Sequence, residues 1–147
     1  MDHMAADGGE TVGRLPDLHS LLGRFADAFG LHVFAGEVID GEFFETFAGP
    51  GMETLLGGRP PGGPDTGEFW SDRVHPDDRT SYRDAMNSIH AGGSAQVDYR
   101  LLGVDGVTRW VRECGHAWSA DGRVFVDGLA LDVSESMKLR MSLRTAA

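Results

Sequence analysis

The first clear pattern in the chain is a helical repeat of apolar residues between positions 15 and 30. Apolar side chains recur there every three or four residues, which places them on one face of a helix. Pro16 suits the first helical turn, and Gly30 suits the position just after the last residue. The pattern predicts an N-terminal flanking helix over residues 15–30, with an apolar stripe made of Leu18, Leu21, Leu22, Phe25 and Phe29.

The pattern changes to that of strands after this helix. Residues 31–39 and 42–48 are rich in Val, Ile and Phe, and Asp40-Gly41 stands between them. An Asp-Gly pair flanked by such runs is the strongest short-range signal for a hairpin. We therefore expect two antiparallel strands joined by a tight turn.

An irregular stretch and a helix follow. Residues 52–56 and 69–74 can each form about one helical turn, whereas the glycine- and proline-rich stretch 57–67 forms no regular structure. The segment His75-Pro76-Asp77-Asp78 starts a longer helix, because proline suits the first turn and acidic residues suit the positive end of the helix dipole. That helix is expected to end near Gly92, with a buried stripe made of Tyr82, Ala85, Met86 and Ile89.

The last part of the chain is expected to form three strands and a short helix. Val97, Tyr99 and Leu101 alternate with polar residues, as in a half-buried strand. Residues 107–118 and 124–133 make two more strands, in which Gly115 suits a bulge, and the Asp-Gly pairs at 105–106 and 121–122 provide the hairpin turns. Ser134 suits the cap of a final helix.

These elements predict an α+β domain. It has one five-stranded antiparallel sheet with helices on one face, together with the flanking N-terminal and C-terminal helices. The remaining residues, 1–14, are polar and aperiodic, so we expect a disordered lead or a remnant of cloning.

Net charge, the length of apolar runs and the cysteine count limit which partners the chain binds and where in the cell we expect it. The chain has 147 residues, enough for one domain, with 13 basic and 23 acidic residues and a formal net charge of −10. This sign disfavours nucleic acid and anionic lipid as partners. No apolar run reaches the roughly 20 residues that a membrane helix needs, and the single cysteine excludes an intrachain disulfide. We expect a soluble, cytoplasmic domain.

The order of elements and the residues at their junctions resemble the PAS sensor-domain family. The resemblance is dense over residues 69–136 and looser over the hairpin at 31–48. Any one of its motifs is unspecific, but all of them occur in the family's order. They are Trp70, His75-Pro76-Asp77-Asp78, Tyr99-Arg100, Asp105-Gly106, Arg109-Trp110-Val111, Asp121-Gly122 and Asp132-Val133-Ser134-Glu135.

The resemblance implies a PAS domain over residues 31–133, whose sheet curls around a cleft closed by helices. In the family this cleft holds a small ligand, heme or flavin, or is simply a packed core. The aromatic, sulfur-containing and apolar candidates for its lining are Trp70, Tyr82, Met86, Tyr99, Trp110 and Cys114.

The resemblance also implies a signalling exit at Asp132, Ser134 and Glu135, which lead into a linker helix at 134–147. In the family such a helix drives an effector, for example a diguanylate cyclase or a histidine kinase. We expect the effector either in a longer form of the protein or supplied in trans. In this family flanking helices often pair, so we also expect a homodimer whose interface is the stripe of the 15–30 helix.

Candidate chemistry is sparse. His75, Asp77 and Asp78 invite a metal or acid–base interpretation, but a helix start explains the same residues and is favoured. His90 lies near the end of the long helix, where heme-binding relatives place the iron ligand, although a lone histidine is more often structural. Light-sensing relatives carry their cysteine in an Asn-Arg-Asn-Cys run that is absent here, so Cys114 is interpreted as a small buried apolar residue.

Two functional hypotheses result. The first is a regulatory sensor that binds a ligand or partner and relays a change through its last helix. The second is a dimerisation or interaction module with a filled core and no ligand; a heme-binding gas sensor is less favoured. We predict no metal, no cofactor and no enzymatic activity, because no acid, base and nucleophile converge.

Overall fold

A computed structural model describes residues 17–60 and 67–146, and the predicted lead at 1–14 and most of the stretch 57–67 lie outside them. The first helix, α2 (Leu18–Phe29), begins at Asp17, whose carboxylate accepts hydrogen bonds from the His19 amide and the Ser20 hydroxyl. It ends at Gly30, which has a left-handed backbone with φ of 66°. The predicted end at Gly30 is confirmed, whereas the cap at Asp17 was not predicted and Pro16 lies outside the described residues.

Five antiparallel strands form one sheet. They are β1 (Leu31–Ile39), β2 (Glu42–Ala48), β3 (Ser94–Leu102), β4 (Thr108–Ala120) and β5 (Arg123–Asp132). Their spatial order is β2-β1-β5-β4-β3, so the first and last strands pair at its centre. The predicted α+β fold class is confirmed.

The three Asp-Gly pairs do not make the same turn. Asp40-Gly41 and Asp121-Gly122 have positive φ at both residues and join directly paired strands, as type I′ hairpins require. The third connection is longer than a tight turn, because β3 ends at Leu102 and β4 begins at Thr108. The expectation of a tight hairpin at this third position is corrected to a five-residue loop.

The predicted bulge at Gly115 is also wrong. The pairing of β4 with both neighbours passes through Gly115 without a shift, and the irregularity of the sheet lies between Ala35 and Gly36. At Gly115 a side-chain carbon would lie 2.9 Å from Cδ1 of Ile89. Glycine is therefore used here for close packing of the long helix onto the sheet.

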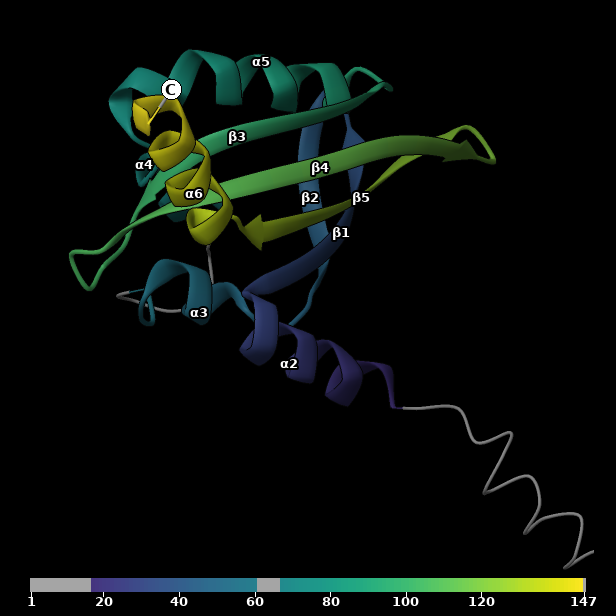
Figure 1. The fold of residues 1–147 in the computed structure, drawn as a ribbon. Helices are drawn as coiled ribbons and strands as arrows, with labels where there is room; N and C mark the ends of the chain where they lie inside the picture. Colours follow the sequence, from purple (N-terminus) through teal and green to yellow (C-terminus); the bar gives the residue numbers. More distant parts are fainter. Residues whose placement is uncertain (1–16, 61–66, 147) are drawn as a thin grey trace, which may run out of the picture.

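The helices lie on both sides of the sheet (Figure 1). The inner face is covered by α3 (Met52–Leu56), α4 (Gly67–Asp72), the 3₁₀ turn η2 (Pro76–Asp78) and α5 (Arg79–His90). The last helix, α6 (Ser134–Ala146), lies instead in front of β3 and β4. There the hydrogen-bonded Arg112 lowers the pKa of Asp98 on the outer face, and Arg140 of α6 adds a smaller effect of the same sign. No helix in the described part of the chain is both long and apolar enough to cross a bilayer.

The His-Pro-Asp-Asp motif has a structural role that sequence reasoning identified only in part. Nδ1 of His75 accepts a hydrogen bond from the Asp77 amide and so caps η2. Asp78 contacts a more distant element, because its carboxylate accepts hydrogen bonds from the backbone amide, Nε and Nη2 of Arg100 on β3, at 2.8–2.9 Å. The motif therefore fixes the start of α5 to the sheet.

The core lies between this inner face and the helices. Its largest fully buried side chains are those of Leu55, Leu56, Val74, Tyr99, Leu101, Val111 and Val126. Most of this cluster sits at the end of the sheet nearest α3 and α4, because Leu55, Leu56 and Trp70 pack there against β3 and β4. The other end of the inner face is left open for a cavity.

Candidate functional site

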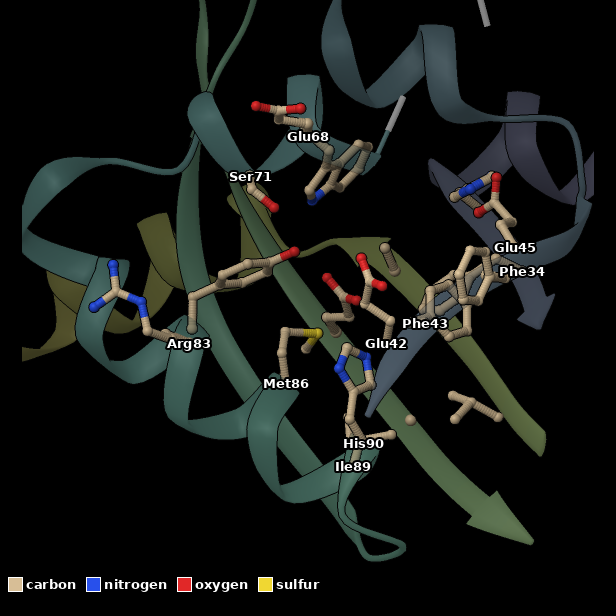
Figure 2. Close-up of a pocket in the computed structure, with 18 of the residues that line it drawn as sticks. Phe34, Glu42, Phe43, Glu45, Glu68, Ser71, Arg83, Met86, Ile89 and His90 are labelled. Carbon is tan, nitrogen blue, oxygen red and sulfur yellow. The ribbon is translucent and has the colours of Figure 1, made fainter. Parts of the chain in front are cut away.

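The inner face of the sheet and helices α4 and α5 enclose a cavity of about 1060 Å³ (Figure 2). Met86 and His90 point into it from α5, and the rings of Phe34 and Phe43 form the opposite wall on β1 and β2. The volume lies just above the range typical of small-molecule sites.

The cavity exists because the central strands carry small residues on the inner face. Ala130 of β5 and Gly115 of β4 line its floor, and Gly128 of β5 lies against the Phe34 ring. A side-chain carbon at Gly128 would lie 2.2 Å from the Phe34 ring, so the aromatic wall depends on this glycine. Larger residues at these positions would fill the space.

A buried chain of hydrogen bonds ends on Glu113 at the cavity floor. Nε1 of Trp70 donates to the Tyr99 hydroxyl at 2.7 Å, and that hydroxyl donates to Oε1 of Glu113 at 2.5 Å. Glu113 is 5% exposed, and burial raises the pKa of its carboxyl to about 7. Burial raises the pKa of Tyr99 as well, so this phenol remains the proton donor.

His32 is the second buried polar group of the cavity. Its side chain is 3% exposed, and neither ring nitrogen has a hydrogen-bond partner among the described residues. Burial lowers the pKa of this imidazole, so the ring is neutral at pH 7. The nearby backbone carbonyls of Pro50 and Gly49 offset part of that shift but do not complete a hydrogen bond of normal geometry. Buried polar atoms without partners are rare in folded proteins, and each calls for an explanation.

The fold and its motifs correspond to a known family model. The model described as the PAS fold matches residues 45–130, which is more than half of the chain. The chain belongs to the PAS family. No curated protein matches it significantly.

Solved structures with this PAS fold come from several signalling proteins. The N-terminal domain of a diguanylate cyclase with PAS/PAC sensor from Marinobacter aquaeolei is 28% identical, with a TM-score of 0.60 over 73% of this chain and 98% of that one. A sensory box histidine kinase/response regulator from Burkholderia thailandensis is 21% identical, with a TM-score of 0.60 over 84% and 92%. An RNA-binding light-oxygen-voltage receptor is 21% identical, with a TM-score of 0.57; the match covers 80% of this chain but only 35% of that protein.

Sequence reasoning placed six side chains in the PAS cleft. Three of them, Trp70, Tyr82 and Met86, line the cavity, and Tyr99 lies beside it within the hydrogen-bond chain. The assignment of Trp110 and Cys114 is corrected, because both lie on the opposite face of the sheet.

The reason is the two-residue period of β4, whose residues 111, 113 and 115 point inward. On the outer face, Trp110 lies under the guanidinium of Arg100, and the Cys114 thiol donates to Gln96 at 3.6 Å. Cys114 is half-buried there rather than part of the core. Since it is the chain's single cysteine, no thiol is placed to form an adduct with a ring in the cleft.

Sequence reasoning missed the two polar groups that distinguish this PAS cleft, His32 and Glu113. A signal was present for both, because each stands among apolar residues with the inward parity of its strand. Parity alone does not show that His32 lacks partners or that Glu113 accepts from Tyr99. Those properties depend on contacts between strands that are distant in sequence.

His90 lies in the PAS cavity rather than facing solvent. Its ring stacks on Phe43 at 5.4 Å between centroids with an interplanar angle of 6°, and burial lowers its pKa. Among the described residues, no group of three or more His, Cys, Asp and Glu side chains is arranged to hold a metal ion.

We expect hemin to produce no stoichiometric Soret band when it is added to the protein. The carboxyl groups that line the cavity disfavour a porphyrin with two propionates. An absorbance titration of the wild type and of His90→Ala measures this. A sharp band in the wild type that the substitution removes would establish His90 as a heme ligand.

Proposed function

We propose that this PAS domain is a regulatory sensor that binds a small molecule in its inner cavity and relays the change through α6 to an effector. The observation that carries the proposal is a cavity of about 1060 Å³ containing polar groups that are buried but not fully bonded. A domain that served only as a packed interaction module would gain stability by filling this space. The cavity therefore favours the sensor over the filled-core alternative.

The relay is supported by a junction where both flanking helices meet the sheet. The Asp132 amide donates to the Gly30 carbonyl at the end of α2, and the Asp132 carboxylate accepts from the Ser134 amide at the start of α6. The predicted capping role of Ser134 is corrected, because its hydroxyl accepts from the Trp110 amide instead. Movement of the central strands therefore acts directly on the first turn of α6.

The effector remains a proposal. Two of the signalling proteins reported above are a diguanylate cyclase and a histidine kinase, and α6 leaves the domain in the position of a linker to such a partner. Glu135 lies exposed in the first turn of this helix and has no hydrogen bond to the sheet among the described residues. It is therefore a surface contact for the effector rather than part of the junction.

A thermal-shift screen with small aromatic acids, amides and amines tests the proposed binding. Met86→Trp fills the cavity from α5, and Met141→Trp on the exposed surface of α6 is the matched control. Compounds that raise the melting temperature of wild type and Met141→Trp, but not of Met86→Trp, support the proposal. A screen without such compounds, with all three proteins folded by circular dichroism, contradicts it.

We also propose that the domain pairs through α2. Ala26 packs against the body of the domain, whereas Leu18, Phe25 and Phe29 remain 69%, 40% and 60% exposed. Only part of the five-residue stripe is therefore exposed, since Leu21 and Leu22 are half-buried within the chain's own fold. A second copy of the helix could cover the exposed part and place two α6 helices side by side.

We expect the wild type to sediment as a dimer at tens of micromolar and Phe25→Glu and Phe29→Glu to sediment as monomers. Covering these rings at about 25 cal/mol per Å² supplies several kcal/mol before association costs, whereas a buried charge opposes association. Arg24→Glu, exposed on the same helix, controls for charge alone. A monomeric wild type, or folded variants that still dimerise, would refute this interface.

A further inference from the structure

The geometry of Glu113 indicates which kind of group a ligand must offer. Trp70 donates to Tyr99 and Tyr99 donates to Glu113, so the chain of donors ends on this carboxyl. Only Oε1 is bonded among the described residues, and Glu113 lines the cavity. The second oxygen is an acceptor available to a donor within the cavity.

No basic side chain in the described part of the cavity neutralises this carboxyl. Five carboxyl groups line the cavity against two guanidinium groups, those of Arg79 and Arg83. Arg79 donates to the backbone carbonyls of Val74 and Asp72. Figure 2 shows Arg83 with its guanidinium directed away from the centre into which Met86 and His90 point. An anionic ligand would therefore meet carboxylates without compensation.

His32 provides a second, separate contact. It pairs with Ala130, and Ala130 pairs with Glu113, so the three residues form one row across β1, β5 and β4. Neighbouring strands lie about 4.8 Å apart, which places the two polar residues roughly 10 Å apart between Cα atoms, with only a methyl group between them. A neutral imidazole offers one N–H donor and one nitrogen acceptor.

The walls of the cavity favour a flat molecule. The centroid of the Trp70 ring lies 6.2 Å from that of the His32 ring. The Phe34 ring lies 6.0 Å from the His32 ring, with an interplanar angle of 25°. Phe43 and Tyr82 add two more rings to the lining. Aromatic surfaces of this kind stack on flat ligands and attract cations.

We propose that the ligand is a flat aromatic or heteroaromatic molecule that carries a cationic N–H donor group at one end, bound by Glu113, and a small polar group at the other end, bound by His32. The proposal rests on the ligand-binding function proposed above and adds the chemistry of recognition. It explains why one row of the sheet holds a carboxyl with one unbonded oxygen and an imidazole without a hydrogen bond of normal geometry, both judged among the described residues.

The binding of a cation is expected to depend on pH. Tyr99 of β3 donates to Glu113. Besides the two arginines already described, the titratable groups that line the cavity with Glu113 are His32 of β1, Glu42 and Glu45 of β2, Glu68 and Asp72 of α4, and Tyr82 and His90 of α5. Burial raises the pKa of both tyrosines and lowers that of both histidines, so these four are uncharged at pH 7 to 8. Glu113, with a pKa of about 7, becomes ionised over this range, and cation binding strengthens with it.

Isothermal titration calorimetry with benzamidine, 4-hydroxybenzamidine and benzoate tests the proposal. Benzamidine and benzoate have similar size and shape but opposite charge, and the para hydroxyl reaches toward His32. We expect benzamidine to bind at least tenfold more tightly than benzoate, and about tenfold more tightly at pH 8 than at pH 6. Glu113→Gln should remove both differences, and His32→Phe should remove the roughly fivefold gain from the hydroxyl.

The failures of the two proposals are distinguishable. If benzoate binds as tightly as benzamidine and Met86→Trp blocks it, the charge assignment is wrong and the sensor function stands. If benzamidine binds wild type and Glu113→Gln equally, Glu113 is not the anchor. If none of the three probes binds, the ligand class is wrong, whereas the sensor function fails only when the thermal-shift screen is also empty.

Discussion

Replacing Glu113 by glutamine is expected to stabilise the protein at pH 8 more than at pH 5.5. Burial raises the pKa of this carboxyl to about 7 in the folded protein, against an ordinary value of 4.5. Between these values the folded state binds more protons than the unfolded state, so the free energy of unfolding falls as the pH rises and levels off above about 7. Glutamine keeps the acceptor for Tyr99 but does not ionise.

The expected size of this effect is about 2 kcal/mol between pH 5.5 and pH 8. Urea unfolding of wild type and Glu113→Gln at both pH values measures it, with the exposed Glu68→Gln as the matched control. A stability difference between wild type and Glu113→Gln that is the same at both pH values would show that Glu113 is not a buried, unneutralised acid. If the substitution stabilises the protein, the wild-type carboxyl lowers the stability of the fold, as residues kept for ligand binding often do.

Gly51→Val is expected to destabilise the fold by about 3 kcal/mol or more, enough to prevent folding in a marginally stable domain. Gly51 has φ of 111°, and a side-chain carbon there would lie 2.1 Å from the Leu31 carbonyl oxygen and 3.1 Å from Cβ of Ala26. The residue precedes α3 and lies where β1 and α2 meet, so the strain cannot be relieved by one flexible side chain.

Gly106→Val separates backbone strain from crowding. Gly106 also has positive φ, at 84°, but a side-chain carbon there has nothing within 4 Å among the described residues. We expect it to cost about 1 kcal/mol, which is the strain of a β-branched residue with positive φ alone. Thermal and urea unfolding of both variants compares the two costs; equal losses would mean that the close approach at Gly51 is not what fixes this junction.

Local patterns were sufficient to predict most of the fold. The stripe of α2, the alternation in β3 and the Asp-Gly pairs at 40–41 and 121–122 each contain their own structural signal within a few residues. Where the prediction failed, the determining contact was distant in sequence. A glycine within a strand pattern predicted a bulge at Gly115. The structure shows instead that a side chain there would collide with Ile89, which packs on it from α5.

The cleft could be predicted only in outline. Trp70, Tyr82 and Met86 were found from aromatic character and helical periodicity, whereas Trp110 and Cys114 were placed on the wrong face because the parity of β4 was not applied to them. The bonding state of a buried polar group is not a local property. Whether His32 has partners depends on what the neighbouring strands and helices offer, and this is where the structure contributed most.

Amide hydrogen exchange of α6 tests the central claim, that occupation of the inner cavity alters the helix that leaves the domain. The probe is a compound that stabilises wild type but not Met86→Trp, added at saturation, with exchange at residues 134–146 followed by mass spectrometry. We predict that exchange in the first turns of α6 changes several-fold in wild type and not in Met86→Trp. Protection of α5 and β4 with unchanged exchange throughout α6 would contradict the account.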